Sequence, residues 1–315
     1  LLGETARFED TRLSATLDGP FRDLTVDHRL TVGRLAAADT VNAETLAQSG
    51  VATYDGETFR IPLNVTAARV VTGSDYIDPR LTGGTLRGML TYSGTQLAAD
   101  NTDIAFPGLN AQLSLRGDTA QGVYALAGPV NARALAIEDI GQVSANSKIL
   151  VKFGPAIPWS VNANLSGVLG EVSNASIATL AGEQVRFDGS LGMGANNPIV
   201  LREVRIGSER LYAELDSRIV GERTTLAGTG RHTEYGPFTF DAEVAGDGPR
   251  AILVLADPYP AAGLKDVRVG LAPSDDGFAI DVAGGSLLGE FDGELGLVLP
   301  ADAPTRIAVE QMRIY

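Results

Sequence analysis

Residues 238–244 read Phe-Thr-Phe-Asp-Ala-Glu-Val, with apolar side chains at every second position and polar ones between them. Successive side chains of a β-strand point to opposite faces, so this period of two predicts a strand with one apolar and one wet face. The same alternation recurs in residues 24–32, 211–219 and 291–299. Repeated alternation along the chain predicts an all-β protein.

Short turns connect the predicted strands. Asp-Gly favours the positive φ angles of tight hairpin turns, and this pair occurs at residues 18–19, 55–56, 188–189, 247–248 and 276–277. Asp292-Gly293 lies inside an alternating run, where it indicates a bulge or a close contact instead. Helix signals are weak: residues 174–180 have Asn174 as an N-cap and Gly182 just past the end, and residues 77–81 predict a turn or a short helix.

No Pro-rich or Ser-rich linker and no charge block marks a domain boundary. We therefore expect residues 1–315 to form a single elongated β-repeat region, with a soft division near residues 165–185 at the short helix. Residues 201–207 (Leu-Arg-Glu-Val-Arg-Ile-Gly) match residues 264–270 (Leu-Lys-Asp-Val-Arg-Val-Gly) in residue type at every position. This internal match predicts a repeated strand-entry signal, and chance similarity between short β segments is the alternative.

The charge balance excludes one class of partner. The chain has 25 Lys+Arg against 39 Asp+Glu, a formal charge of −14, whereas a non-specific nucleic-acid binder needs surplus positive charge to neutralise phosphates. The same balance argues against docking on anionic lipid heads through a basic patch. Cysteine is absent, which removes disulfides, thiolate catalysis and cysteine-based zinc sites together.

The inventory of catalytic residues is poor, and we predict no enzyme, no metal and no cofactor. His28 and His232 are the only histidines. His28 lies on the apolar side of its predicted strand, which favours a satisfied core residue, and His232 lies in a polar, Gly-rich stretch typical of a solvated turn. The zincin, nucleophile-elbow and P-loop motifs are all missing from the sequence.

Paired carboxylates are the residues that sugar or calcium chemistry would require. Asp275-Asp276 predicts a hairpin turn and Glu138-Asp139 ends an apolar segment, and neither pair is embedded among aromatic residues, of which Trp159 is the single tryptophan. A glycosidase needs two carboxyl groups held across a cleft, so a carbohydrate-active domain is a third-ranked hypothesis. The acids of residues 100–103 lack calcium-loop spacing and predict a solvated acidic loop.

No stretch of the sequence has the pattern typical of a membrane-spanning helix or of a signal peptide. Its longest clean apolar run, residues 251–256, is far shorter than the ~18 residues that a spanning helix needs. The chain begins at Leu1 and has no basic segment followed by an apolar one. We therefore expect a piece of a longer protein whose anchor lies outside this chain.

The C-terminal third carries a succession of turn and strand motifs. In order they are Tyr-Gly-Pro-Phe at 235–238, Ala-Asp-Pro at 256–258, Gly-Leu-Lys-Asp-Val-Arg-Val at 263–269, Leu-Ala-Pro-Ser-Asp-Asp-Gly-Phe at 271–278, Gly-Gly-Ser-Leu-Leu-Gly-Glu-Phe-Asp-Gly at 284–293 and Leu-Val-Leu-Pro at 297–300. This succession resembles the central region of TamB-like translocation and assembly module proteins of Gram-negative bacteria, part of the AsmA-like group. Residues 13–21 are similar to another segment of that type.

The resemblance implies a role in lipid transport. Such proteins are anchored by one helix in the inner membrane, span the periplasm as long β troughs with an apolar inside, and are implicated in moving phospholipid and in outer-membrane biogenesis. It implies phospholipid acyl chains as the ligand of this segment. An outer-membrane β-barrel partner would be met by regions outside this chain, and the family offers no catalytic residues.

The expected fold is an elongated, curled antiparallel or mixed sheet that forms an open trough, β-taco or solenoid-like, with at most one or two short helices. The candidate groove-lining residues occupy the apolar side of the clearest strands: Phe238, Phe240, Ile280, Val282, Phe291, Leu295, Leu297 and Leu299. The alternative is a structural β-solenoid or sandwich, such as an adhesin or autotransporter-like stalk, with a closed core and no lipid.

Overall fold

The computed structural model describes residues 6–37, 41–73, 78–138, 140–195, 197–246, 248–274, 277–298 and 306–315. Within these ranges the chain forms twenty-one β-strands and one α-helix, and the strands belong to one open antiparallel sheet that is not closed into a barrel. The expectation of an all-β chain with an open sheet is confirmed. The sheet is antiparallel rather than mixed because short hairpins join sequential strands.

The chain divides into two compact units. Unit 1 comprises Leu1–Glu138 with Gln142–Leu165, and unit 2 comprises Asp139–Gly141 with Ser166–Tyr315. The change from one unit to the other falls inside a strand, between Leu165 and Ser166. A boundary inside a strand has no Pro-rich or Ser-rich linker, which explains why the composition of the sequence does not mark it.

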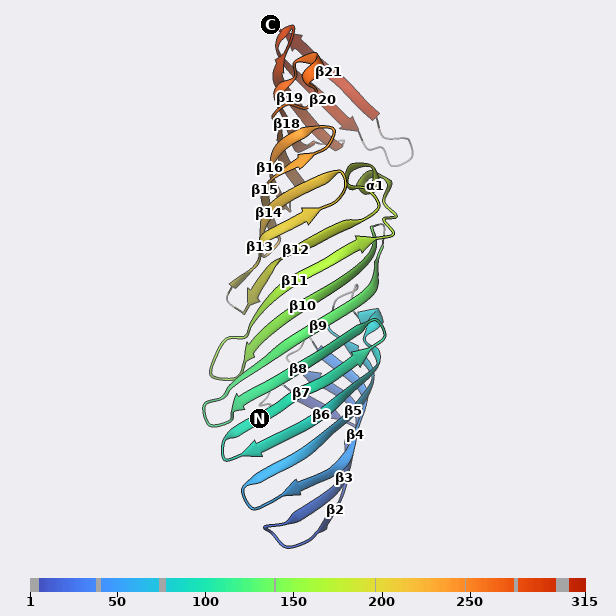
Figure 1. Ribbon diagram of the computed structural model, residues 1–315, viewed down its shortest axis with the longest axis vertical. Helices are drawn as coiled ribbons and strands as arrows, with labels where there is room; N and C mark the ends of the chain where they lie inside the picture. The colour runs from blue at the N-terminus through green and yellow to red at the C-terminus, as the bar shows by residue number, and fades with distance from the viewer. Residues whose placement is uncertain are drawn as a thin grey trace. The chain divides into compact units, whose positions relative to one another are not determined.

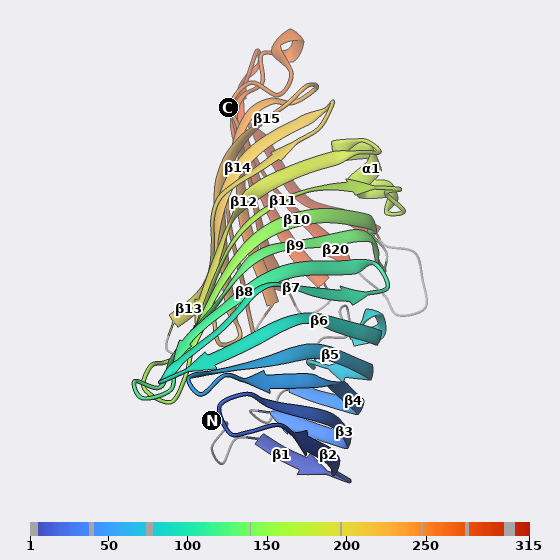
Figure 2. The same cartoon turned by 60° about the horizontal axis from the view of Figure 1, so that its bottom comes forward.

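Unit 1 is built from long strands that follow one another along the chain (Figures 1 and 2). They are β1 (Ala6–Glu9), β2 (Arg12–Asp18), β3 (Leu24–Ala37), β4 (Val41–Tyr54), β5 (Thr58–Val71), β6 (Thr82–Ser93), β7 (Gln96–Phe106), β8 (Leu109–Asp118), β9 (Val123–Ile137), β10 (Gly141–Phe153) and the first half of β11 (Ser160–Gly170). β1 and β2 both pair with β3 and share its outer edge. The 3₁₀-helix η2 (Asp78–Arg80) precedes β6 and confirms the short helix expected around Pro79.

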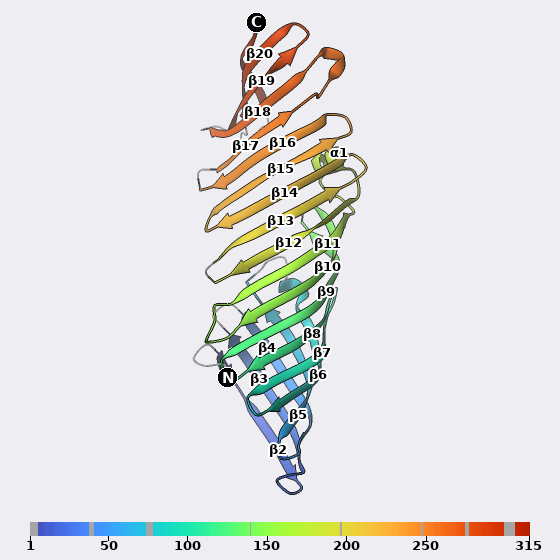
Figure 3. The same cartoon turned by 60° about the vertical axis from the view of Figure 1, so that its left-hand side comes forward.

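Unit 2 continues the same up-and-down pattern with shorter strands (Figure 3). They are β12 (Val185–Gly194), β13 (Asn197–Gly207), β14 (Leu211–Val220), β15 (Arg223–His232), β16 (Gly236–Ala245), β17 (Gly248–Leu255), β18 (Lys265–Ser274), β19 (Gly277–Ser286), β20 (Gly289–Val298) and β21 (Arg306–Ile314). A 3₁₀-helix, η3 (Pro260–Ala262), lies between β17 and β18. The predicted helix is α1 (Ala175–Ala181), and its Asn174 N-cap accepts hydrogen bonds from the N–H groups of Ser176 and Ile177.

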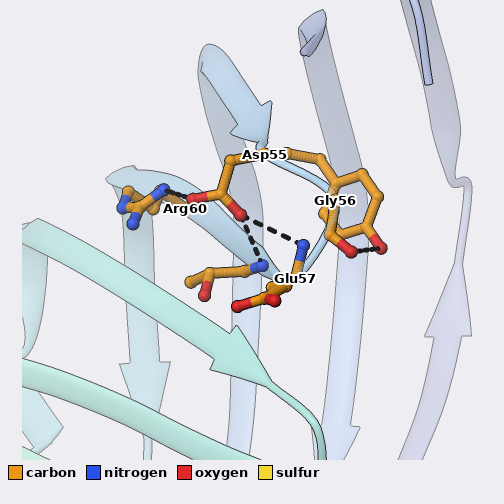
Figure 4. Close-up of polar contacts among 6 residues, drawn as sticks. Asp55, Gly56, Glu57 and Arg60 are labelled. Carbon is orange, nitrogen blue, oxygen red and sulfur yellow. Dashed lines mark hydrogen bonds and ion pairs between the residues drawn. The ribbon is translucent and has the colours of Figure 1, made fainter. Parts of the chain in front are cut away.

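The Asp-Gly pair at 55–56 forms the tight turn between β4 and β5, as predicted (Figure 4). The Oδ1 atom of Asp55 accepts hydrogen bonds from the N–H groups of Glu57 and Thr58 at 3.1 and 2.8 Å, and its Oδ2 atom accepts one from Arg60 at 2.6 Å. Gly56 has a φ of 96°, a conformation that glycine adopts without a steric penalty. The aspartate therefore closes the hairpin and glycine allows its backbone path.

The structure agrees only in part with the predictions made for the other Asp-Gly pairs. Asp18 ends β2 and Gly19 opens the connection to β3, which runs over residues 19–23 and is longer than a tight turn. Residues 188–189 lie inside β12 at a register shift, so the predicted turn there is wrong. Asp247 and Asp276, and therefore both of their turns, lie outside the described residues. Asp292-Gly293 lies within β20, where a Cβ on Gly293 would be 2.9 Å from Met312 Sδ, so the expected close contact is confirmed.

The two matching segments share a β-bulge. Their acidic residues, Glu203 and Asp266, have φ angles of 50° and 48°, and a register shift lies at each. The N–H of Glu203 donates to Asp216 Oδ1 at 2.7 Å, and that of Asp266 donates to the Ala256 carbonyl at 2.9 Å. Residues 264–270 open β18, as predicted, but residues 201–207 lie inside β13. The feature that the two segments share is therefore the bulge.

The buried core is thin. Among the described residues no large side chain is less than 2% exposed, and six of the twelve buried hydrophobic residues are alanines. Two sheets packed face to face would enclose a core about 10 Å thick, filled by large side chains from both inner faces. The described part of the chain has no such closed core.

Candidate functional site

Rows of apolar side chains cross the strands of unit 2 on one face of the sheet. Directly opposite residues of an antiparallel pair have their side chains on the same face. One row of opposed residues runs from β13 to β20 through Val204, Leu215, Gly228, Phe240, Leu253, Val269, Val282 and Gly293. A second runs from β15 to β20 through Leu226, Ala242, Ala251, Leu271, Ile280 and Leu295. We call these two rows, together with the other residues on the same side of strands β13 to β20, the apolar face.

Seven of the eight predicted lining residues have their side chains on this side of the sheet. Phe238 and Phe240 come from β16, Ile280 and Val282 from β19, and Phe291, Leu295 and Leu297 from β20. All seven are half-buried. Leu299 lies outside the described residues. Strands β17 and β18 bridge the two groups, so residues far apart in the sequence lie on one continuous surface.

The bridging residues on β17 and β18 were missed by the sequence analysis. Leu253 is opposite Phe240 on one side and Val269 on the other. Residues 251–255 are all apolar, so β17 has no alternation from which its two faces can be told apart. The opposite face of β17 carries Ile252, which is 39% exposed, in register with Asp241.

The opposite face of unit 2 is polar. Asp241, Asp281 and Glu294 lie in one cross-strand row, and all three are exposed. Arg205 lies between Asp188 and Glu214, with an N to O distance of 3.6 Å to each. Exposed ion pairs contribute little to stability. We therefore assign to these charged residues the role of keeping the polar face hydrated.

Glycines receive the aromatic rings of the apolar face. Gly230 is opposite Phe238, and a Cβ on Gly230 would lie 2.4 Å from the Cζ atom of that ring. Gly228 is opposite Phe240, with a corresponding distance of 2.8 Å. Because the rings occupy the space above the neighbouring strand, they add apolar area without standing far out from the sheet.

Unit 1 has an apolar groove with a volume of about 370 Å³ on its first five strands. It is lined by Phe8, Leu13, His28, Leu30, Val32, Leu35, Leu46, Gln48, Ile61, Leu63 and Val65. Nine of these eleven residues are hydrocarbon or aromatic. The groove is therefore the counterpart, in unit 1, of the apolar face in unit 2.

The two polar residues of the groove serve the sheet itself. Pro62 lies in the interior of β5, where it cannot donate to the ladder, and the regular pairing of β4 with β5 is interrupted there. Gln48 replaces the missing bonds: its Nε2 donates to the Pro62 carbonyl at 2.6 Å and its Oε1 accepts from Asn64 N–H at 2.8 Å. His28 Nε2 lies 3.3 Å from the same amide nitrogen, so the expected satisfied histidine is found on the apolar side of β3.

His232 is buried, at 5% exposure, and the prediction of a solvated turn residue is wrong. Its Nδ1 accepts hydrogen bonds from the N–H groups of Glu234 and Tyr235, which assigns the proton to Nε2. Nε2 then donates to the Leu180 carbonyl at the end of α1, at 3.0 Å. His232 thus connects the β15–β16 turn to the helix, and all its nitrogen atoms are used in that connection.

The acids at 100–103 form no loop, contrary to the prediction. They lie in β7, where Asp100 pairs with Arg116 and Asp103 accepts a hydrogen bond from Gln112. Across the described ranges no group of three or more His, Asp or Glu side chains is arranged to hold a metal ion. The same ranges contain no helix that is long and apolar enough to cross a membrane.

The chain matches no protein-family model, no curated protein and no solved structure at a significant level.

Proposed function

We propose that this chain is a non-enzymatic segment of a periplasmic, inner-membrane-anchored protein that shields phospholipid acyl chains on its apolar face during transport to the outer membrane. The observation that supports the proposal most directly is the row from Val204 to Gly293, which crosses eight strands without a charged side chain. The sequence resemblance to TamB-like proteins supports the same role. An outer-membrane β-barrel partner would be contacted by regions outside this chain.

The direction of the row suits an acyl chain. Strands are spaced by ~4.8 Å, so a row across eight strands extends for roughly 35 Å. Each methylene removed from water contributes ~0.8 kcal/mol, and a chain lying on one face gains part of this for every methylene it covers. A row of uncharged, apolar residues and glycines offers no single polar anchor point, which allows a bound chain to slide along it.

The test is lipid occupancy of the purified segment after expression in a Gram-negative periplasm. We expect phospholipid to co-purify and to be detected by mass spectrometry of the native protein. Leu253→Asp and Leu297→Asp place a charge on the apolar face and should each remove most of the bound lipid.

Ile252→Asp and Asp241→Asn are matched controls. Ile252 is the neighbour of Leu253 on the same strand, but it lies on the polar face beside Asp241. Both controls should retain lipid at the wild-type level. A folded wild-type preparation without lipid, or an equal loss in Leu253→Asp and Ile252→Asp, would overturn the proposal and favour a purely structural β protein.

A further inference from the structure

The tip of the β19–β20 hairpin presents two leucines to solvent. Leu287 and Leu288 are 76% and 78% exposed, the highest values for large hydrophobic side chains in the described part of the chain. They occupy the turn between Ser286 and Gly289, where polar residues and glycine are usual. Adjacent exposed leucines at a hairpin apex are a cost in water, so they call for a binding explanation.

Hydrogen bonds hold this tip in place. Ser286 Oγ donates to the Gly289 carbonyl at 2.9 Å and accepts from Leu288 N–H at 3.1 Å. The N–H of Leu287 donates to the Ala262 carbonyl of η3 at 3.1 Å. Gly263, with a φ of 63°, leaves room for Leu287, because a Cβ there would lie 2.7 Å from Leu287 Cγ. The two side chains are therefore presented outward by an ordered scaffold.

Tyr259 is a further exposed residue at the same end of the strands as the two leucines. Connections between sequential antiparallel strands alternate between the two ends of the strands. The β17–β18 and β19–β20 connections therefore lie at one end, whereas the β14–β15 and β18–β19 turns lie at the other end. Tyr259, in the β17–β18 connection, is 60% exposed. The β17–β18 connection that holds Tyr259 is bonded to the leucine turn through Ala262. A tyrosine, with an apolar body and a polar tip, together with leucines has the composition of a membrane-interface element. We call Tyr259, Leu287 and Leu288 the hairpin tip.

The small size of the hairpin tip decides between occupants. A lasting interface with a folded protein or a second copy buries about 800 Å² on each partner, far more than three side chains on two turns supply. A bilayer sets no such minimum, because each inserted side chain leaves water independently. Lys265 and Glu290, both in register with Gly285, place opposite charges beside the tip. The net charge of −14 then disfavours anionic lipid.

We propose that the hairpin tip docks unit 2 on a membrane surface by inserting Leu287 and Leu288 into the interfacial region of a zwitterionic bilayer. The leucines enter below the headgroups and Tyr259 lies at their level. This docking does not require lipid on the apolar face, so its test is independent of the proposed shielding of acyl chains.

The test uses phosphatidylcholine vesicles and the intact segment. We expect wild-type protein to float with vesicles, and the double variant Leu287→Ser/Leu288→Ser to bind at least roughly tenfold more weakly, since two apolar side chains are lost. Both leucines are exposed, so the variant should unfold in urea as the wild type does. Val220→Ser, at an exposed valine at the opposite end of the strands, is the matched control and should bind vesicles as the wild type does.

A fluorescent reporter places the tip in the bilayer. Leu288→Trp in a Trp159→Phe background leaves one tryptophan, whose emission should shift to the blue on adding vesicles and be quenched by lipids brominated on the acyl chain. Val220→Trp in the same background should show neither effect. Added phosphatidylglycerol should weaken binding.

Three results would overturn the membrane-docking proposal. They are wild-type binding by the double variant, equal quenching of both reporters, and a blue shift that depends on protein concentration without vesicles, which would identify a second copy as the occupant.

Discussion

The ring of Phe106 covers Gly84: a Cβ added to that glycine would lie 2.2 Å from the ring's Cε1 atom. Gly84 lies on β6 and Phe106 on β7, and their neighbours Thr85 and Ala105 are directly opposite each other. Unit 1 repeats the relationship at Gly117 and Tyr124, again at 2.2 Å. Glycine–aromatic pairing is thus a device that both units use on their apolar side.

The first prediction concerns this pairing. Gly84→Ala should lower the free energy of unfolding by about 1–3 kcal/mol, because its methyl group must displace the Phe106 ring from a filled site. The measurement is urea unfolding followed by circular dichroism. Gly207→Ala is the control: nothing lies within 4 Å of a Cβ there, so stability should change by less than about 0.5 kcal/mol. Equal effects of the two substitutions would contradict the assignment.

The second prediction concerns the repair of the β4–β5 ladder. Gln48→Leu keeps the volume of the side chain but leaves the Pro62 carbonyl and the Asn64 N–H without their bonds to the amide. We expect a loss of about 1–3 kcal/mol in urea unfolding, although the groove becomes more apolar. Gln112→Leu removes an exposed amide bonded to Asp103 and should be nearly neutral. A Gln48→Leu protein as stable as wild type would show that the amide bonds are dispensable.

The third prediction is a pH dependence at the β4–β5 turn. The hydrogen bond from Arg60, followed by those from the N–H groups of Thr58 and Glu57, lowers the pKa of Asp55 from 3.8 to about 2. A depressed pKa in the folded state means that Asp55 contributes stability above pH 4, and that this contribution disappears as the pH falls toward 2. The stability difference between wild type and Asp55→Asn should therefore shrink over that range.

Urea unfolding between pH 2 and pH 6 measures the effect at Asp55, since the window is set by its ordinary and folded pKa values. Glu222→Gln, at an exposed residue of the β14–β15 turn, is the control. Its profile should run parallel to that of the wild type. A pH-independent difference for Asp55→Asn would mean that the aspartate acts without its charge.

Alternation predicted the architecture well where strands have one wet face. Phe238 and Phe240 on β16 could be assigned to the apolar side from residue type alone, because Thr239 and Asp241 separate and follow them. Leu253 could not, since its neighbours on β17 are also apolar. Cross-strand register, which depends on the turns, was needed to place Leu253 opposite Phe240.

Predictions from local sequence were wrong where tertiary contacts determine the conformation of a residue. His232 stands in a polar stretch, yet it is buried because a helix 52 residues earlier in the chain supplies the Leu180 carbonyl that it bonds. Asp188-Gly189 has the composition of a turn, but the pairing of β12 with β13 absorbs it as an irregularity within the strand. Leu287 and Leu288 interrupt no sequence pattern, and only the structure shows that their side chains are exposed.

Hairpin-by-hairpin pairing has a consequence for how the chain reaches its native state. In the β14–β15 hairpin Val220 pairs with Arg223 at the turn, and Leu211 pairs with His232 at the far end, so every loop to be closed is short. Short loops carry a small entropic cost and favour rapid formation of each pair. A completed hairpin then supplies the edge on which the next strand assembles. Unit 2 can therefore fold one strand at a time, from its N-terminal to its C-terminal strands, while the chain is still being synthesised.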